Sequence, residues 1–275
     1  MPAALKREQA RRFLRKIYID VVGPTTESVE GHTGVPVARD EDSKWNFVGT
    51  ISDKTPETIL RVHKEFFPGR AMGGTAPSLV YCDNGGEFAS VYADHVVDPG
   101  GTFEHSIEGR PRTNAKAERF HRTLGGSTRA CLKQANGPLR FWAACTRHTA
   151  VNLNHIPDGR PDGHSPYIRR KGKEPRRVLV PWGCAATFYD EEAVKFQCRG
   201  KPGLVYGYGQ LGAFRMLDLV EYIEGHGKIR IITTRDCKIQ PMVLPLVKLV
   251  KDRPEYNTWA FIMRGLQEGD MDYRV

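Results

Sequence analysis

An acidic residue inside a strand is the feature that most limits how this chain can fold. Residues 16–22 read KIYIDVV, where Ile17, Ile19 and Val21 share one face of the predicted strand. Apolar residues at every second position are typical of a strand that buries one face of a sheet. Asp20 lies on the other face, so the fold must accommodate a carboxylate within the sheet.

Short apolar runs and amphipathic runs follow one another through the first part of the chain. A helix is expected to open at Thr55-Pro56. An apolar strand ends at Asp83, and a further helix is expected from about Glu87. The remaining expected elements are two short strands within residues 33–53, a short strand within residues 101–106, and amphipathic helices over residues 115–135 and 138–157. The glycine pair Gly125-Gly126 is expected to weaken the middle of the first of these helices.

The composition changes after Pro157. Residues 158–177 are rich in glycine, proline and basic side chains, which predicts a linker. Four β-rich runs follow and predict a small antiparallel barrel over residues 178–245. The predicted domains are therefore a first domain at residues 12–157, the basic linker, the β module and a tail at residues 246–275.

The chain carries a net positive charge, with 41 Lys and Arg against 32 Asp and Glu and a formal net charge of +9. A basic surface favours polyanions, of which nucleic acid is the commonest, although charge alone also fits a merely basic soluble protein. The basic residues of the linker could bind DNA, serve as a nuclear localisation signal or simply be solvated. They are Arg169, Arg170, Lys171, Lys173, Arg176 and Arg177.

The cysteines and the apolar runs indicate the compartment. The six cysteines include no C-x-x-C pair and no nearby histidine pair at zinc-binding spacing, so we expect reduced thiols and no zinc site. No run approaches the ~18 apolar residues of a membrane helix, and the first residues are too polar for a signal peptide. We therefore expect an intracellular protein that does not enter a membrane.

Three acidic residues, Asp20, Asp83 and Glu118, are placed so that they could meet. They lie within a strand, at the end of a strand and one turn into a helix. If the two strands are neighbours and the helix packs beside them, the carboxylates could hold two Mg²⁺ ions, an arrangement that suits phosphoryl displacement. Oxygen ligands are the ones that Mg²⁺ prefers.

Simpler interpretations of the same residues stay open. Asp83 begins the run Asp-Asn-Gly-Gly, which by itself favours a turn. Glu118 has Arg122 four residues later, so it could belong to a solvated helix face with one ion pair. The basic side chains of Lys116, Arg119 and Arg122 around an acidic cluster would instead suit a phosphodiester substrate.

Three segments resemble the signature blocks of retroviral and retrotransposon integrases: YIDVVGP, VYCDNGGEF and GRPRTNAKAERFHRTL. In this resemblance Asp20, Asp83 and Glu118 match the D,D-35-E triad, with 34 residues between the last two. Later segments resemble the helix after the triad and the SH3-like module of copia-type elements, so that the resemblance covers about residues 16–240. It implies an α/β fold with an RNase H-like mixed five-stranded sheet and flanking helices, followed by a small all-β SH3-like barrel.

The resemblance also implies an activity. A metal-dependent polynucleotidyl transferase would trim DNA 3′ ends and join them to target DNA, with Asp20, Asp83 and Glu118 holding two Mg²⁺ (or Mn²⁺) ions. DNA would be the partner of a homo-oligomer that acts in the nucleus and needs no small-molecule cofactor. The residues expected to contact DNA are Asn114, which is somewhat better explained as a helix cap, Lys116, Arg119 and Arg122.

Two features depart from such integrases. No His-His-Cys-Cys zinc module precedes Lys16, and no reverse transcriptase, protease or capsid segment is present, so we expect a fragment of a polyprotein or an isolated reading frame. Two other functions stay open. One is a metal-dependent nuclease on the same fold, which cleaves without joining, and the other is a catalytically inactive DNA-binding relic of a transposon.

Overall fold

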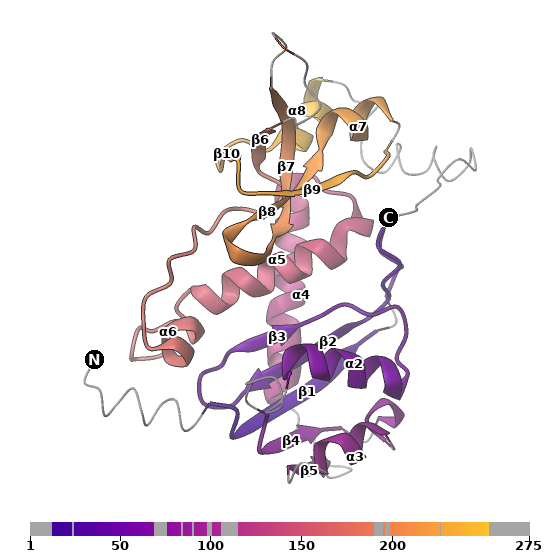
Figure 1. The fold of residues 1–275 in the computed structure, drawn as a ribbon, viewed down its shortest axis with the longest axis vertical. Coiled ribbons are helices and arrows are strands. Elements are labelled where there is room, and N and C mark those ends of the chain that lie inside the picture. Colours follow the sequence, from indigo (N-terminus) through magenta and orange to yellow (C-terminus); the bar gives the residue numbers. More distant parts are fainter. Residues whose placement is uncertain are drawn as a thin grey trace. The chain divides into compact units, whose positions relative to one another are not determined.

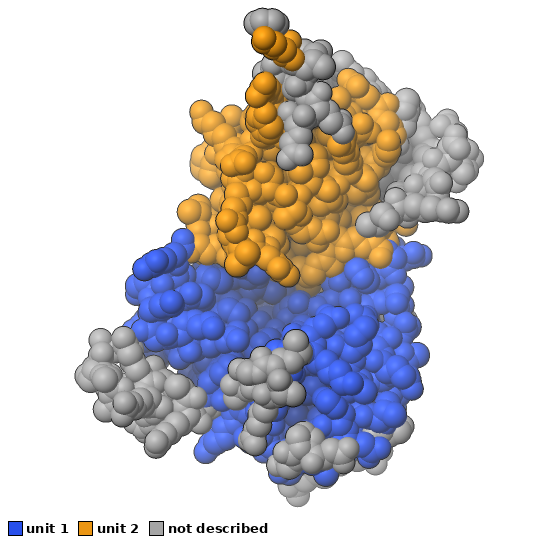
Figure 2. All heavy atoms as spheres, in the orientation of Figure 1, with its two compact units in different colours: residues 1–27, 31–125, 150–176 blue, residues 28–30, 126–149, 177–275 orange. Residues whose placement is uncertain are grey.

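The chain forms two compact units, each built around one five-stranded sheet (Figures 1 and 2). The first unit comprises residues 1–27, 31–125 and 150–176, and the second comprises residues 28–30, 126–149 and 177–275. A computed structural model describes residues 13–23, 25–68, 76–83, 85–89, 91–97, 101–105, 115–189, 195, 199–225 and 227–252.

The sheet of the first unit is mixed, with the strand order β3-β2-β1-β4-β5. The first three strands pair antiparallel, whereas β4 runs parallel to β1 and β5 runs parallel to β4. This arrangement confirms the predicted RNase H-like mixed five-stranded sheet. The strands are β1 (Lys16–Val22), β2 (Val35–Asp40), β3 (Asn46–Val48), β4 (Leu79–Cys82) and β5 (Thr102–His105).

The apolar face of β1 supplies the centre of this unit's core. Ile17 and Ile19 are almost completely buried, and they belong to one cluster with Ile59 of helix α2 (Pro56–Phe66) and Tyr92 of helix α3 (Val91–Val97). Helix α2 begins where the sequence predicted, because the Thr55 side chain accepts a hydrogen bond from the backbone N–H of Thr58 and Pro56 occupies the first turn. The second predicted helix begins as the 3₁₀ turn η2 (Gly86–Phe88) before α3.

Helix α4 (Ala115–Ala135) is continuous through Gly125 and Gly126, which were expected to weaken it. Phe120, Leu124 and Leu132 on the same helix are buried. Packing of an apolar face contributes more to a helix in a protein than intrinsic propensity does, so the glycines do not interrupt it. A short 3₁₀ turn, η3 (Leu139–Phe141), then leads into helix α5 (Trp142–His155), and the boundary between the two units falls within α4 and within α5.

The stretch predicted as a linker contains a helix, α6 (Pro166–Lys171), and its residues up to 176 belong to the first unit. Ser165 caps the helix by accepting a hydrogen bond from the backbone N–H of Ile168, and Gly172 ends it in the left-handed conformation with φ 65°. The Ser-Pro pair and the glycine are start and stop signals that the abundance of basic and turn-forming residues obscured.

The second unit contains an antiparallel sheet with the order β10-β6-β7-β8-β9, which confirms the predicted antiparallel module. Its core includes Phe188, Val205 and Met216. Two helices that the sequence pattern did not predict also occur here, and the second of them begins at the start of the predicted tail. The elements are β6 (Ala185–Tyr189), β7 (Gly200–Tyr208), η4 (Gln210–Gly212), β8 (Phe214–Asp218), α7 (Leu219–Glu224), β9 (Ile231–Thr234), β10 (Cys237–Gln240) and α8 (Pro245–Asp252).

Among the helices that the structure describes, none combines the length and the apolar character needed to cross a membrane.

Candidate active site

The two strand acids leave the sheet on neighbouring parallel strands. β1 pairs with β4 so that Tyr18 is opposite Tyr81, and the two rings contact each other with centroids 5.6 Å apart. Asp20 follows Tyr18 by two residues, and Asp83, directly after β4, follows Tyr81 by two residues. Because side chains alternate along a strand, both carboxylates lie on the tyrosine side, opposite the apolar core.

The three predicted catalytic acids share one electrostatic environment. The pKa of Asp20 is raised to about 6, first by burial and then by the negative charges of Asp83 and Glu118. The backbone N–H of Val21, which donates to Asp20 Oδ1 at 2.8 Å, opposes this shift. Glu118 is exposed in the first turn of α4. The structure therefore brings the three acids close enough for their charges to interact.

Asp83 is both a turn residue and a member of this site. Its Oδ1 accepts a hydrogen bond from the backbone N–H of Gly85 at 3.1 Å, as the turn interpretation expects. A Cβ atom at Gly85 would lie 2.5 Å from Glu87 Oε2 and 3.1 Å from Asp83 Oδ1. A side chain at Gly85 would therefore have to displace the carboxylate of Glu87, which lies at the end of a flexible side chain. The turn thus holds the carboxylate of Asp83 in place, so the turn interpretation and the site interpretation are compatible.

His121 is a site residue that the sequence reasoning missed. It follows Glu118 by three residues, which places both on one side of α4. Its Nε2 lies 3.4 Å from Asp20 Oδ2, and burial lowers the pKa of His121 to about 4. The ring is therefore neutral at pH 7, so this contact is not an ion pair. Nε2 is buried without a hydrogen-bond partner among the residues that the structure describes.

Lys54, which sequence reasoning also missed, lies between the end of β1 and the turn that follows β4. Its Nζ donates to the carbonyl oxygen of Val21 at 3.1 Å and lies 3.7 Å from Glu87 Oε1. Lys54 thereby links the residue after Asp20 with the turn after Asp83, and its charge lowers the pKa of Asp20. No local sequence signal distinguishes Lys54, because it lies in the loop before α2.

The predicted DNA-contacting residues lie on or before α4. Arg119 and Arg122 are exposed on the helix. Lys116 lies in the first turn of the helix, but its side chain is outside the described part, and Asn114 lies outside the described residues altogether. Both exposed guanidinium groups lie on α4 within one to four residues of Glu118.

The acids suit a hard divalent cation chemically, although the described residues do not form a compact cage. Among them, no group of three or more His, Cys, Asp or Glu side chains lies close enough to hold one metal ion. The acids whose charges act on Asp20 carry carboxylate oxygens, which Mg²⁺ prefers. A cation would also offset the repulsion that raises the pKa of Asp20.

Together these features describe a class of protein with an RNase H-like α/β fold and acids at the ends of two adjacent parallel strands and on a helix. No known family model matches the chain. The chain is 26% identical over 246 residues to the "Retrovirus-related Pol polyprotein from transposon TNT 1-94" of Nicotiana tabacum, a match that covers 83% of this chain and 17% of that polyprotein. The chain thus spans about a sixth of the length of this relative.

A solved structure of the catalytic core domain of BIV integrase is also similar, with 19% identity, a TM-score of 0.43 and coverage of 56% of this chain and 91% of that one. In sequence the chain is thus similar to part of a retrotransposon Pol polyprotein, the kind of element that its three signature segments resemble.

Proposed function

We propose that the first unit is a polynucleotidyl transferase that trims DNA 3′ ends and joins them to target DNA, as part of a retrotransposon integrase that acts in the nucleus as a homo-oligomer. The observation that carries the proposal is that Asp20, near the end of β1, lies close enough to Asp83 and Glu118 for their negative charges to raise its pKa further than burial alone does. A purely structural site would be expected to pair such charges within the chain. Here the partly buried Asp20 carboxylate has two acids as neighbours and a neutral histidine beside it.

The chain's own residues hold this site in place. The turn at Gly85 orients Asp83, and Lys54 ties that turn to the end of β1. Asp20, Asp83 and Glu118 would hold two Mg²⁺ or Mn²⁺ ions. When bound, such ions activate an attacking oxygen and stabilise a leaving oxygen in an in-line displacement. Arg119 and Arg122 would contact DNA phosphates and position the strand.

Incubating the purified protein and a labelled blunt duplex with Mn²⁺ or Mg²⁺ tests the proposal. The duplex pool should combine retrotransposon-like ends with random ends, because the cognate ends are unknown. We expect shortened 3′ ends and joined strands on a sequencing gel. Asp83→Asn and Glu118→Gln should each reduce both products by about 100-fold or more, since each removes several kcal/mol of metal-dependent stabilisation.

A matched acid outside the site provides the control. Glu57→Gln changes an exposed carboxylate on α2 and should leave both products unchanged. Shortened ends without joined strands would favour the nuclease. DNA binding with no metal-dependent products would identify a catalytically inactive relic and contradict the proposal.

A further inference from the structure

A cavity of about 450 Å³ lies within the first unit, beside the helix that carries Glu118. Its volume is in the range of small-molecule sites. The β2–β3 hairpin, helix α4 and the end of α5 each contribute to its wall. The side chains used in the argument below are Arg39, Arg119, Phe120, Thr123, Leu153 and Ile156.

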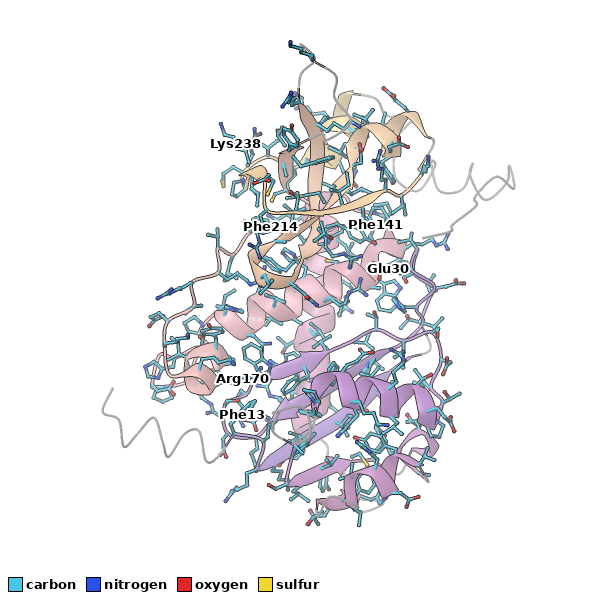
Figure 3. All side chains as sticks on the ribbon, in the orientation of Figure 1. Phe13, Glu30, Phe141, Arg170, Phe214 and Lys238 are labelled. Carbon is cyan, nitrogen blue, oxygen red and sulfur yellow. The ribbon has the colours of Figure 1, made fainter. Side chains whose placement is uncertain are left out.

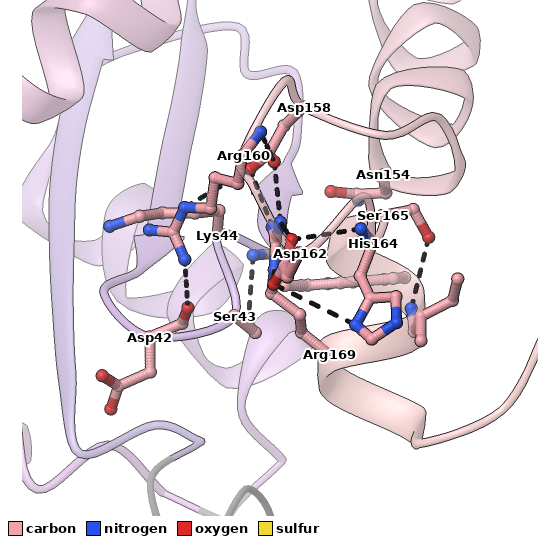
Figure 4. Close-up of polar contacts among 12 residues, drawn as sticks. Asp42, Ser43, Lys44, Asn154, Asp158, Arg160, Asp162, His164, Ser165 and Arg169 are labelled. Carbon is pink, nitrogen blue, oxygen red and sulfur yellow. Dashed lines mark hydrogen bonds and ion pairs between the residues drawn. The ribbon is translucent and has the colours of Figure 1, made fainter. Parts of the chain in front are cut away.

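The acidic side chains in the wall already have partners in the chain. Both carboxylate oxygens of Asp40 accept hydrogen bonds, Oδ1 from the backbone N–H of Leu14 and Oδ2 from the backbone N–H and hydroxyl of Ser43. Asp158 accepts two hydrogen bonds of 2.8 Å from the terminal nitrogens of Arg169, as Figure 4 shows. Glu41, the third acid of the wall, accepts a hydrogen bond from the Tyr18 hydroxyl at 2.8 Å, so each of these carboxylates has a partner within the chain.

Arg39, in contrast, faces the cavity without a carboxylate partner. Its Nη1 donates to Asn46 Oδ1 at 2.7 Å, and its guanidinium stacks on the Phe120 ring, 4.9 Å from the centroid. Within the described part of the chain, Arg39 forms no ion pair. The guanidinium has five N–H donors, so most of its hydrogen-bonding capacity is unused by side chains.

The surroundings of Arg39 disfavour its positive charge. The pKa of Arg39 is lowered to about 10, first by burial and also by the nearby cations Arg160, Arg169 and Arg119, while Asp158 opposes the shift. A partly buried cation in such surroundings is stabilised by an anion that supplies both charge and acceptors. The cavity also offers apolar surface from Phe120, Leu153 and Ile156.

We propose that this cavity binds a small organic anion, whose carboxylate or phosphate pairs with Arg39 and Arg119 and whose apolar body lies against Phe120, Leu153 and Ile156. Arginine is suited to this role because its planar fork binds both kinds of group through two parallel hydrogen bonds. A free organic anion and the terminal phosphate of a DNA strand present the same chemistry.

Occupancy would also affect the proposed active site. Arg119, Phe120 and Thr123 belong to the same helix as Glu118, so a ligand in the cavity would contact the helix that positions this acid. This consequence rests on the proposed function, whereas binding itself does not.

Fluorescence titration of the full chain with 1-naphthyl phosphate and 1-naphthoate tests the proposal, with 1-naphthol as the uncharged control. We expect saturable binding of both anions and at least about tenfold weaker binding of 1-naphthol, because the charged pair is lost. Arg39→Gln should weaken the anions by at least about tenfold. Arg61→Gln, which changes an arginine with 59% side-chain exposure on α2, should not weaken them.

A second cavity variant covers the case in which the first variant does not fold. If Arg39→Gln fails to fold by circular dichroism, Thr123→Trp, which would fill the cavity from α4, should block binding instead.

A 5′-phosphorylated single strand that displaces the naphthyl probe would identify DNA as the source of the anion, and a strand that does not would identify a free anion. Glu118→Gln should still bind the probe, so loss of DNA chemistry and loss of this site are distinguishable. Absence of saturable binding, equal binding of 1-naphthol or unchanged affinity in both cavity variants would overturn the proposal.

Discussion

The first unit arranges charged residues in two opposite ways, at the anchor of α6 and at the candidate active site. In the anchor, Arg169 and Arg170 are enclosed by partners from the same chain. At the active site, Asp20 lies among other acids and beside a neutral His121 with an unsatisfied nitrogen. Arg169 and Arg170 are thus compensated by residues of the chain. The negative charge of Asp20, in contrast, lies among further negative charges, as is common at functional sites.

Arg169 shows the compensation by acids. Its side chain is 5% exposed, and it donates two hydrogen bonds to Asp158 and two to Asp162, at 2.7 to 2.9 Å (Figure 4). Such fork-shaped pairing satisfies the buried guanidinium almost completely. The first arginine of the basic run is therefore committed to a contact within the chain.

Arg170 shows compensation by aromatic rings. Figure 3 labels Arg170 beside Phe13. The guanidinium of Arg170 lies 4.7 Å from the centroid of Phe13, 4.4 Å from that of Trp45 and 5.2 Å from that of Phe47. The negative faces of the rings stabilise the cation. Arg169 and Arg170 are therefore engaged within the chain in the state described, and Arg177 likewise lies over a ring, 4.8 Å from the centroid of Tyr208. Of the linker cations expected to bind DNA or form a localisation signal, Lys171, Lys173 and Arg176 remain.

Breaking the acid clamp, the pairing of Arg169 with Asp158 and Asp162, should have the largest effect on stability. Arg169→Met leaves two carboxylates without their partner, and we expect the free energy of unfolding of the first unit to fall by about 2–4 kcal/mol. Arg160→Met is the control, because that side chain is 38% exposed, and it should cost less than about 1 kcal/mol. Urea unfolding measures both. Equal losses would show that the clamp has no special role.

Removing a charge from the active site should have the opposite sign. In the absence of divalent cations, Asp20→Asn should stabilise the protein at pH 7 by about 1–3 kcal/mol, while it abolishes the proposed DNA chemistry. The pKa of Asp20 is raised to about 6 in the folded protein from an ordinary value near 3.8. The favourable contribution of the protonated group is therefore complete below about pH 4 and is lost as the pH rises through 6.

The pH dependence makes this prediction specific. The difference between Asp20→Asn and wild type should be absent below about pH 4, grow up to about pH 6 and then remain constant. Thermal unfolding across this range measures it, and added Mg²⁺ should stabilise only the wild type. A variant that is less stable than wild type at pH 7 would show that the acids are compensated within the chain after all.

Changing the aromatic anchor should have the smallest effect. Arg170→Lys keeps the charge but loses the flat stacking of the guanidinium, so we expect the free energy of unfolding to fall by about 1 kcal/mol. The emission of Trp45 should change as well, because the group over its ring is replaced. Arg176→Lys, at an exposed position, should leave stability and emission unchanged. A loss as large as that of Arg169→Met would contradict the ranking of the two anchors.

Much of the first unit follows from local sequence. The period-two pattern of Ile17, Ile19 and Val21 sets the buried face of β1, and Thr55-Pro56 sets the start of α2. Those signals depend on nearest neighbours along the chain, so they can be read without tertiary contacts. The prediction of Asp20, Asp83 and Glu118 as site residues combined such local elements with a family resemblance.

Tertiary structure decided which charges are compensated and which are not. Lys54, Glu87 and His121 join the site only because separate segments meet there, and their local sequence carries no distinctive signal. Arg169 and Arg170 appeared in the sequence as two adjacent linker cations, yet one is enclosed by carboxylates and the other by rings. The sequence by itself determined the strands of the first unit, the start of α2 and, together with the family resemblance, the candidate acids. The burial and partners of each charge depended on contacts between residues far apart in the chain, and these dominate the free energy of a buried charge.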